Sequence, residues 1–598
     1  MRTSKARADT TFMDSATEGK RVSPAIARLA EAVDFAPHHT AAEMREFATL
    51  RHMVVFLAVL AGYAALTVLL FWQVLPHLSS ALLGPPEDNL NDFWNSWYVL
   101  QKHPGGFFFT HLLRYPEGAS LYYHSFAYPQ LFTVWVLSKF FGTLIPTIIQ
   151  LQNFTILASF PLAGAGAFYL CRYLGGGIIG SAAGGFIFAF SPWHVGQAMH
   201  HMLGTGVAFL PCFVLCYLQA LKRQSYRWLA SASLFYALSA LSGWYYLFFC
   251  FYFLAFHILY LRVHHHAWPR GWNLLAPALC LAGAGVVLLP LILPMLVTGF
   301  SSSAYQPGSN IFVADLLGYT AFPPTHALAF LDENLLHRFT GGPWEATVYL
   351  GLVNLALLGC GLWRTQRSER RVLWYALGGM IFFAVLASGD ALHWMGNTLP
   401  IHMPGIVLSK LPFFANVRSP ARAIVFVYLF MGIGVAVTIA AILKSKRTIL
   451  TGIVLGVALS LSLIDFFPAT LETTAVSCSP TLSILAHDRD RNFGVLDLPY
   501  GYSEGSFYMA QQACHGRSIA QGTLARQLAP TTADHLNIGD LAKQRRQLAA
   551  AKIKYILLHR PQGTLFSWLP EYDGKPETYR QFYPVVADRP DMTILRVY

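Results

Sequence analysis

Charged side chains are scarce in this chain. Only 12% of its 598 residues are Asp, Glu, Lys or Arg, whereas 55% are hydrophobic and the mean hydropathy is +0.43. Soluble domains carry about 25% charged residues, so the composition excludes an ordinary soluble protein. The chain also lacks a Walker loop, a dinucleotide-binding glycine fingerprint, an HExxH helix and a Cys-x-x-Cys pair. It therefore shows no signature of nucleotide-dependent, zinc-peptidase or thiol-redox chemistry.

Long apolar runs are the dominant feature of what is present. A helix that crosses a bilayer needs about 20 apolar residues, and its backbone must satisfy its own hydrogen bonds. Suitable runs lie near 53–75, 148–171, 176–193, 203–222, 226–243, 245–262, 274–298, 346–364, 372–388, 420–443 and 448–467. They predict a mainly α protein, a polytopic transmembrane helical bundle with about 11 spans. Only Gly243 and Trp244 separate two of the runs, which therefore form a tight hairpin or one broken element.

The net charge of +12 invites a nucleic-acid interpretation, but the distribution of the charge argues against it. Basic residues gather in alternate turns between the runs, as they do in cytoplasmic loops of membrane proteins. The predicted inner turns contain Arg172, Lys222, Arg223, Arg227, Arg262, Arg270, Arg364, Arg367, Arg370, Arg371, Lys444, Lys446 and Arg447. The outer loops contain Lys102, Arg114, Lys139, Arg338, Lys410, Arg418 and Arg422. With the N-terminus in the cytoplasm, eleven spans place the C-terminus outside.

This assignment divides the chain into three parts. Residues 1–51 form a cytoplasmic, partly disordered tail, and 52–468 form the transmembrane domain with a large first outer loop at 76–147. Counting the run 127–142 as a span would put the basic turns outside, so we place it as a helix in the outer interface. Residues 469–598 are more polar and predict a small α/β domain, with strands at 494–498, 552–558 and 592–597 and a helix at 533–551. On the oxidising outer side, Cys478 and Cys514 form a disulfide or remain two buried thiols.

The first outer loop contains an amphipathic helix. Leu90, Phe93, Trp94, Trp97 and Tyr98 repeat with the spacing of one helical face. Aspartate at position 88 lies at the start of this helix, where the free N–H groups and the helix dipole favour a carboxylate. It is either an N-cap or a general base at the membrane surface. The carboxylate of Asp92, one turn on, is an alternative base or a substrate ligand.

The other outer loops supply further polar candidates. The second contains His194, His200 and His201 but no acid, and a neighbouring histidine pair is a poor chelate, so we expect no tightly held metal and no cofactor. Either His200 or His201 binds a phosphate or sugar, or both are interfacial histidines bonded to the backbone. A weak divalent metal stays possible.

Two arginines, Arg418 and Arg422, lie where the fourth outer loop enters a span. Arginine is costly there unless it is paired, and its planar fork suits phosphate oxygens. They recognise a lipid-linked phosphate or extend to the lipid headgroups. Glu345, just before another span, pairs with one of these arginines or holds a sugar hydroxyl.

The order of these features resembles the GT-C class of membrane glycosyltransferases. A broad bacterial branch of that class is similar in the stretches EDNLNDFWNSWY (87–98), RYPEGASLYYH (114–124), FSPWHVGQAMHH (190–201), PWEATVYLGLVNL (343–355), LPFFANVRSPARA (411–423) and LDLPYGY (496–502). Asp88 matches the acid that acts on the acceptor in that class, whereas Asp92 does not. His124 ends the second stretch and is a candidate substrate ligand. The chain departs from the class because its second outer loop lacks an acidic motif.

The resemblance implies an inverting hexosyl or pentosyl transferase in a bacterial inner membrane, with the C-terminal domain in the periplasm. A polyprenyl-phosphate sugar would be the donor, and a cell-envelope molecule would be the acceptor. Membrane lipids would surround the protein, and we expect no nucleic acid as a partner. Asp88 would be the general base. Two alternatives remain: a transporter or flippase for a lipid-linked substrate, to which Gln150, Gln152, Asn153 and Pro161 contribute some polarity, and a non-catalytic assembly factor.

Overall fold

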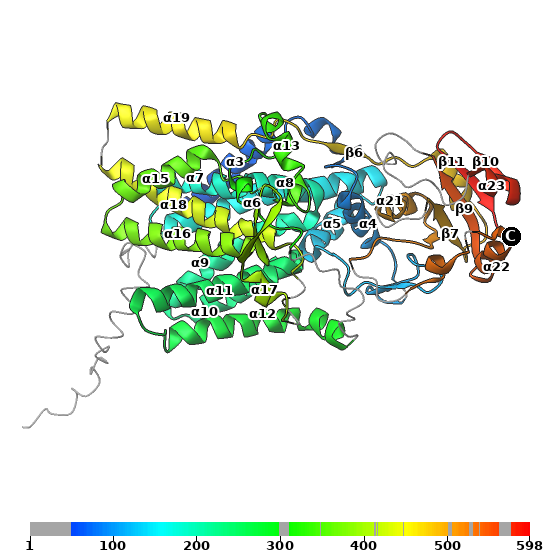
Figure 1. Cartoon of the computed structure of the whole chain (residues 1–598), viewed down its shortest axis with the longest axis horizontal. Coiled ribbons are helices and arrows are strands. Elements are labelled where there is room, and N and C mark those ends of the chain that lie inside the picture. Colours follow the sequence, from blue (N-terminus) through cyan, green and yellow to red (C-terminus); the bar gives the residue numbers. More distant parts are fainter. Residues whose placement is uncertain are drawn as a thin grey trace, which may run out of the picture.

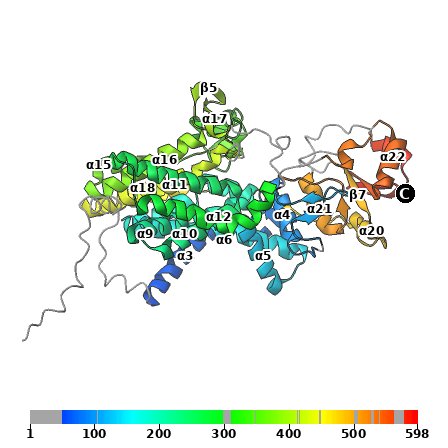
Figure 2. The ribbon, with the colours of Figure 1, turned by 90° about the horizontal axis from the view of Figure 1, so that it is seen from below.

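The computed structural model describes residues 50–598 except 104, 298–309, 347, 412–413, 415–416, 446–447, 500–504, 526–529, 538 and 561–575. Our expectations for residues 1–49 lie outside these ranges. Long helices form a bundle at one end of the molecule, and a small α/β unit forms the other end (Figure 1). Elements of the first loop lie between the two, and the view from below shows the same order (Figure 2).

Every predicted apolar run contains a helix. They are α3 (Leu50–Leu70), α6 (Ile145–Tyr173), α7 (Gly177–Ala189), α9 (Leu210–Arg223), α10 (Tyr226–Ser242), α11 (Trp244–His265), α12 (Trp272–Val297), α15 (Leu352–Arg364), α16 (Arg367–Ala387), α18 (Ile424–Ser445) and α19 (Ile449–Asp465). Among the described residues, eight helical stretches are long and apolar enough to cross a membrane, and α15 and α19 are shorter apolar helices. The predicted transmembrane bundle is thus confirmed, and the number of crossings stays a prediction.

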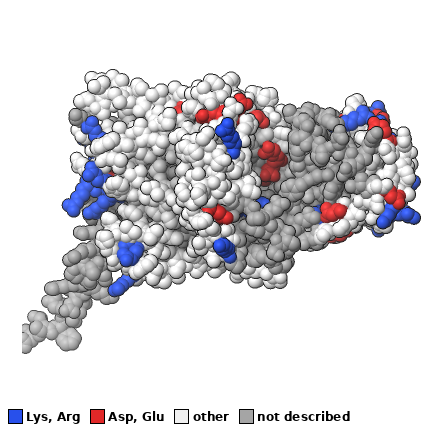
Figure 3. Space-filling model, viewed as in Figure 1, with Lys and Arg blue, Asp and Glu red and all other residues white. Residues whose placement is uncertain are grey.

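Helix α18 is the centre of the bundle. All of its apolar window is buried, and it packs against α7, α15 and α16. Glycines let α7 approach closely, since a Cβ on Gly184 would lie 2.5 Å from the Gly432 carbonyl oxygen. On the face shown in Figure 3, the flank of the bundle is almost free of charged side chains, while Lys and Arg gather at the end away from the α/β unit. An uncharged flank is what a lipid-facing surface requires.

The run 176–193 is not one continuous helix. Helix α7 ends at Ala189, and α8 (Pro192–His200) begins after Ser191, whose hydroxyl accepts the His194 N–H at 3.3 Å. Proline at the first helical position has no N–H that needs a partner, so Pro192 is a suitable first residue for α8. A 3-10 helix, η3 (Met202–Phe209), follows and leads into α9. Much of the predicted second outer loop is therefore helical.

The segments outside the bundle are short. The first loop contains η2 (Leu75–His77), β1 (Ala81–Leu83), α4 (Asp88–Tyr98), β2 (Phe109–Thr110), β3 (Ala119–Ser120) and α5 (Tyr128–Phe141). The segment between α12 and α15 contains η5 (Leu317–Tyr319), η6 (Ala329–Leu331), α13 (Glu333–Leu336) and α14 (Pro343–Ala346). The segment between α16 and α18 contains β4 (Ala391–Trp394), β5 (Asn397–His402), α17 (Gly405–Leu408) and η8 (Pro420–Ala423). Helix α5 coincides with the run that we place in the interface, and its Phe132 and Phe140 are exposed.

The α/β unit has a five-stranded mixed sheet in the order β10-β11-β9-β7-β8. Its strands are β7 (Gly494–Leu498), β8 (Ser518–Ile519), β9 (Ile553–His559), β10 (Val585–Asp588) and β11 (Met592–Arg596), and its helices include α20 (Ser483–Ala486), α21 (Gly505–His515), α22 (Leu541–Ala550) and α23 (Pro576–Phe582). The three predicted strands are confirmed to within a residue at each end. The predicted helix 533–551 is wrong in its first half: α22 starts only after Asp540, whose carboxylate caps the Lys543 N–H.

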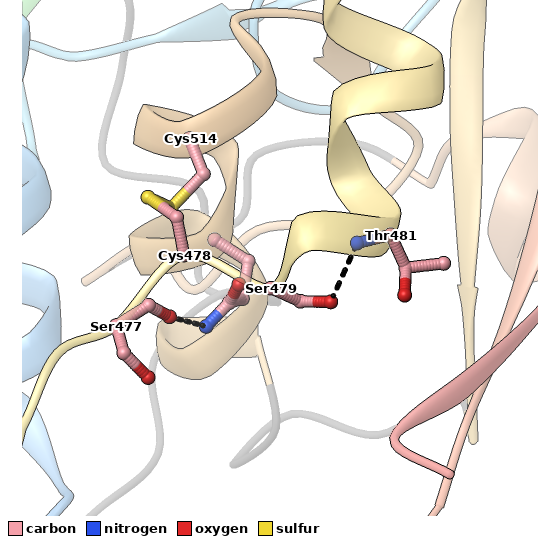
Figure 4. Close-up of a disulfide and its surroundings, with 6 residues drawn as sticks. Ser477, Cys478, Ser479, Thr481 and Cys514 are labelled. Atoms are coloured by element: carbon pink, nitrogen blue, oxygen red, sulfur yellow. Dashed lines mark hydrogen bonds between the residues drawn. A yellow bond between two sulfur atoms is a disulfide. The ribbon is translucent and has the colours of Figure 1, made fainter. Parts of the chain in front are cut away.

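The α/β unit is tied to the first loop at several points. Strand β1 pairs antiparallel with β6 (Thr473–Ala475), and the Tyr115 N–H donates to the Ile519 carbonyl beside the edge strand β8. The indole of Trp94 donates to Gln512 of α21 at 2.7 Å. The Cys478–Cys514 disulfide joins α21 to the segment after β6 (Figure 4). The predicted disulfide is therefore present, and α4 shares a core with α21.

Candidate functional site

Polar residues of α6 hold the first loop in place. The Asn153 amide donates to the carbonyls of Leu78 and Ala81 at 2.9 and 2.8 Å and accepts the Leu83 N–H. The Gln152 amide donates to the Asn89 carbonyl at 3.3 Å, and its oxygen accepts the Ser96 hydroxyl at 3.1 Å. These buried amides therefore fix both β1 and α4 against the bundle.

A close backbone approach brings the start of α4 to the end of α8. Gly84 has φ +93, and a Cβ there would lie 1.7 Å from the Met199 carbonyl oxygen. Only glycine fits this position, because it tolerates the positive φ and has no side chain. The contact places Glu87 and Asp88 directly opposite His200 and His201.

Asp88 is the first residue of α4. The N-cap position belongs to Glu87, which makes no side-chain capping bond, so the N-cap interpretation of Asp88 is wrong. The Asp88 carboxylate instead lies 3.1 Å from Nδ1 of His201. Its side chain is 51% exposed, whereas that of His201 is 15% exposed. The site thus presents an accessible carboxylate backed by a mostly buried imidazole.

A chain of hydrogen bonds continues from His201 into the protein. Nη2 of Arg422 lies 3.2 Å from Nε2 of His201, and a guanidinium can only donate. Nε2 is therefore the acceptor, and Nδ1 carries the hydrogen that faces Asp88. The Arg422 Nε donates to both oxygens of Glu345, at 3.0 and 3.2 Å, and Nη2 donates to one of them as well. The guanidinium also lies 4.8 Å from the ring centre of Tyr245.

The charges of this chain act on one another. Burial raises the pKa of Asp88, but His201 and Arg422 outweigh it, so the net pKa lies below its usual value. Burial lowers the pKa of His201, but the Asp88 carboxylate outweighs it and the net pKa is raised. The pKa of Glu345 is lowered, because Arg422 outweighs the effect of burial. Both carboxylates are therefore ionised at neutral pH.

A second arm runs beside the first. Oε2 of Glu87 lies 3.7 Å from Nε2 of His200, and the side chains are 61% and 6% exposed respectively. Nδ1 of His200 lies 2.8 Å from the Gly196 carbonyl, and the ring packs against Trp344 with 4.5 Å between ring centres. Sequence reasoning missed both Glu87 and Trp344. Each of the two lies next in the sequence to an acid that is a candidate site residue: Glu87 precedes Asp88, and Trp344 precedes Glu345.

Asp92 lies behind the open carboxylate. Its side chain is buried, and Oδ2 accepts the N–H of Met202 at 2.5 Å. Met202 directly follows His201 in the chain. Burial raises its pKa to about 7, although hydrogen bonds from Met202 and Asn95 partly oppose this. Asp92 thus holds the peptide that carries His201 and does not face the open side of the site.

The histidines at 124 and 194 are core residues. Nε2 of His124 bonds to Asn95 at 2.8 Å, burial lowers its pKa to about 4, and only 1% of the residue is exposed. His194 is equally buried and bonds to the Ala189 carbonyl and the Ser159 hydroxyl. Both support the site from behind, so the structure does not place His124 where it could touch a substrate.

The structure brings Arg422, but not Arg418, to Asp88. Arg418 is half-buried and makes no hydrogen bond or ion pair with another described residue. Its neighbours Val417 and Pro420 line a shallow apolar hollow, together with Phe249, Tyr252, Leu386, Gly405, Leu408, Ser409, Phe414 and Ala423. Arg418 therefore lies at the edge of an apolar hollow with its charge unpaired by the described part of the chain.

The site does not fit a metal ion. Within the described ranges, no group of three or more His, Cys, Asp or Glu side chains is arranged to hold one. The Nε2 lone pair of His201 accepts a hydrogen bond from Arg422, so it is not free to bind a metal ion.

The bundle and its first loop have the GT-C fold of membrane glycosyltransferases. The crystal structure of the apo Archaeoglobus fulgidus oligosaccharyltransferase is similar with a TM-score of 0.51 and 10% identity, covering 84% of this chain and 69% of that one. The cryo-EM structure of arabinofuranosyltransferase AftD from Mycobacteria is similar with a TM-score of 0.53 and 12% identity, covering 90% and 41%. Residues 50–467 match the model of a domain of unknown function, DUF6311, and the chain belongs to that family. No curated protein sequence matches it.

Proposed function

We propose that the protein transfers a sugar from a polyprenyl-phosphate donor to an acceptor hydroxyl, with Asp88 as the general base. One observation carries the proposal: the half-exposed Asp88 carboxylate is held by the buried chain His201–Arg422–Glu345. A base must be accessible to its substrate and fixed in orientation. The GT-C fold favours sugar transfer as the reaction, and both similar structures are glycosyl-transferring enzymes by name.

In the proposed step, the acceptor oxygen attacks the anomeric carbon while its proton moves to Asp88. The bond from that carbon to the phosphate oxygen breaks, and the phosphate leaves with the electron pair. Attack from the face opposite the leaving group inverts the anomeric centre. Because the N–H of His201 remains bonded to the carboxylate, the ring keeps its orientation throughout.

The two arginines take different roles in this proposal. Glu345 already offsets the charge of Arg422, so Arg422 orients His201 and does not bind the leaving phosphate. Arg418, at the edge of the apolar hollow and without a counter-charge among the described residues, would pair with the phosphate. The α/β unit, tied to α4 through Gln512, would help to bind a cell-envelope acceptor. The extracytoplasmic side of the inner membrane is the expected location of the site.

The structure gives the transport alternative less support than it gives glycosyl transfer. Gln152 and Asn153 are occupied in holding the first loop, so these amides do not line a path through the bundle. His257 of α11 is fully buried and bonds to the Tyr375 hydroxyl at 3.1 Å, which also leaves no open polar route at that position.

The test is sugar release from a radiolabelled polyprenyl-phosphate sugar by the purified protein. We expect Asp88→Asn to lower the rate by at least about a hundredfold, the usual contribution of a general base. Glu472→Gln is the matched control, since it neutralises an exposed carboxylate near the same loop. Release that survives Asp88→Asn would remove Asp88 from the chemistry. Absence of release from every donor tried would favour the transporter or the assembly factor.

A further inference from the structure

Two hydrogen-bond acceptors face each other beside Asp88. The Gly196 carbonyl can only accept, so Nδ1 of His200 carries the hydrogen, and Nε2 of the neutral ring holds a lone pair. That lone pair faces the Glu87 carboxylate across 3.7 Å, which is longer than a hydrogen bond. Nε2 has no hydrogen-bond partner among the described residues, although only 6% of the His200 side chain is exposed. A buried acceptor without a donor is costly, so a donor belongs in this gap.

The surrounding charge indicates what kind of donor fits. Three carboxylates, from Glu87, Asp88 and Glu345, are opposed by the single guanidinium of Arg422, which gives a net charge of −2 with both imidazole rings neutral. This favours a cationic ligand. A hydroxyl group has one hydrogen and can donate to only one of the two acceptors. A water molecule has two hydrogens and can donate to both, but it brings no charge. A primary ammonium group has three hydrogens, donates to both and also offsets part of the negative charge.

We infer that Glu87 and His200 bind a primary amino group of a substrate, so that one reacting partner is an amino sugar or another amine-bearing molecule. The inference rests on the proposed function and names the substrate class for the same site. The 61% exposure of Glu87 leaves the ligand a way in, whereas the ring of His200 is fixed by Gly196 and Trp344. A divalent cation would use the same two atoms, but no group of three His, Cys, Asp or Glu side chains among the described residues is arranged to hold one.

Direct binding tests the inference without any turnover. The purified protein is titrated calorimetrically with D-glucosamine and with D-glucose, which differ in one amino group. We expect at least about tenfold tighter binding of glucosamine, the value of a charge-assisted hydrogen bond. Glu87→Gln, which keeps the shape but removes the charge, should abolish the difference, and Glu472→Gln should retain it. Equal binding of the two sugars overturns the inference, and so does a preference that survives Glu87→Gln.

Transfer assays then distinguish the source of the amine. One arm compares two polyprenyl-phosphate donors that differ by an amino group in place of a hydroxyl group; the other keeps the donor and varies the acceptor in the same way. A preference in kcat/KM of about 10- to 100-fold in either arm, reduced by Glu87→Gln, supports the inference. Transfer without preference in either arm overturns it while the proposed function stands. Activity that is lost with EDTA and restored by Mn²⁺ would assign the pair to a metal and would also overturn it.

Discussion

Removing one partner of the buried ion pair between Glu345 and Arg422 should cost far more stability than removing one partner of an exposed ion pair. Its two side chains are 13% and 9% exposed, so removing one charge leaves the other buried without a counter-charge. Breaking a buried pair in this way costs about 3–5 kcal/mol. Glu345→Gln keeps one oxygen that can accept from Arg422, so we expect the lower end, about 3 kcal/mol.

The chain contains its own control for this prediction. Glu369 bonds to Lys444 at 2.8 Å, but the lysine side chain is 66% exposed. Glu369→Gln makes the same chemical change at a pair that water already screens, and it should cost about 0–1 kcal/mol. The double variant Glu345→Gln/Arg422→Gln removes both buried charges and should be more stable than Glu345→Gln alone.

The assay is the midpoint of thermal unfolding in a mild detergent, with protein concentration and scan rate held constant because unfolding is expected to be irreversible. Glu345→Gln should lower the midpoint well below both the wild-type value and that of Glu369→Gln. Equal midpoints for Glu345→Gln and Glu369→Gln would refute the reasoning, because the burial of the pair would then carry no energetic weight. A double variant less stable than both single variants would refute it too.

Three further predictions concern the first loop and the α/β unit that contacts it. Gly84→Ala should abolish sugar release and destabilise the protein by more than about 1 kcal/mol, given the positive φ and the 1.7 Å approach of a backbone oxygen, whereas Gly62→Ala, with open space around it, should not. Burial raises the pKa of Asp92 to about 7, so the folded protein loses stability as the pH rises from about 4 to above 7 and this carboxyl group ionises. Asp92→Asn should therefore be more stable than the wild type at about pH 8 and lose this advantage towards about pH 5. A stability difference between the two proteins that stays constant across this pH range would contradict the prediction. Replacing both Cys478 and Cys514 by serine should cost about 4 kcal/mol, since the disulfide closes a loop with a sequence separation of 36, and an unchanged unfolding midpoint would contradict this.

Local pattern alone determined much of the architecture. Twenty-residue apolar runs form helices because a bilayer leaves the backbone no other partners, and each predicted run does contain one. The amphipathic spacing from Leu90 to Tyr98 forms α4, and three of the five strands of the α/β sheet follow from short apolar segments between turns. The sequence also indicated Asp88, from its place at the start of a helix and its match to the GT-C acid. It indicated that Glu345 pairs with Arg418 or Arg422 or holds a sugar hydroxyl; the pair with Arg422 is confirmed.

Only the tertiary structure decided which of these charges meet. His201, Arg422 and Glu345 are far apart in the chain, and no local signal states that one imidazole bridges Asp88 to the guanidinium. That arrangement depends on the close approach of Gly84 to α8 and on the packing of α18 against α7, both of which are long-range contacts. Sequence periodicity reports which face of a helix is apolar, but the partner across that face is set by the packing of the whole bundle.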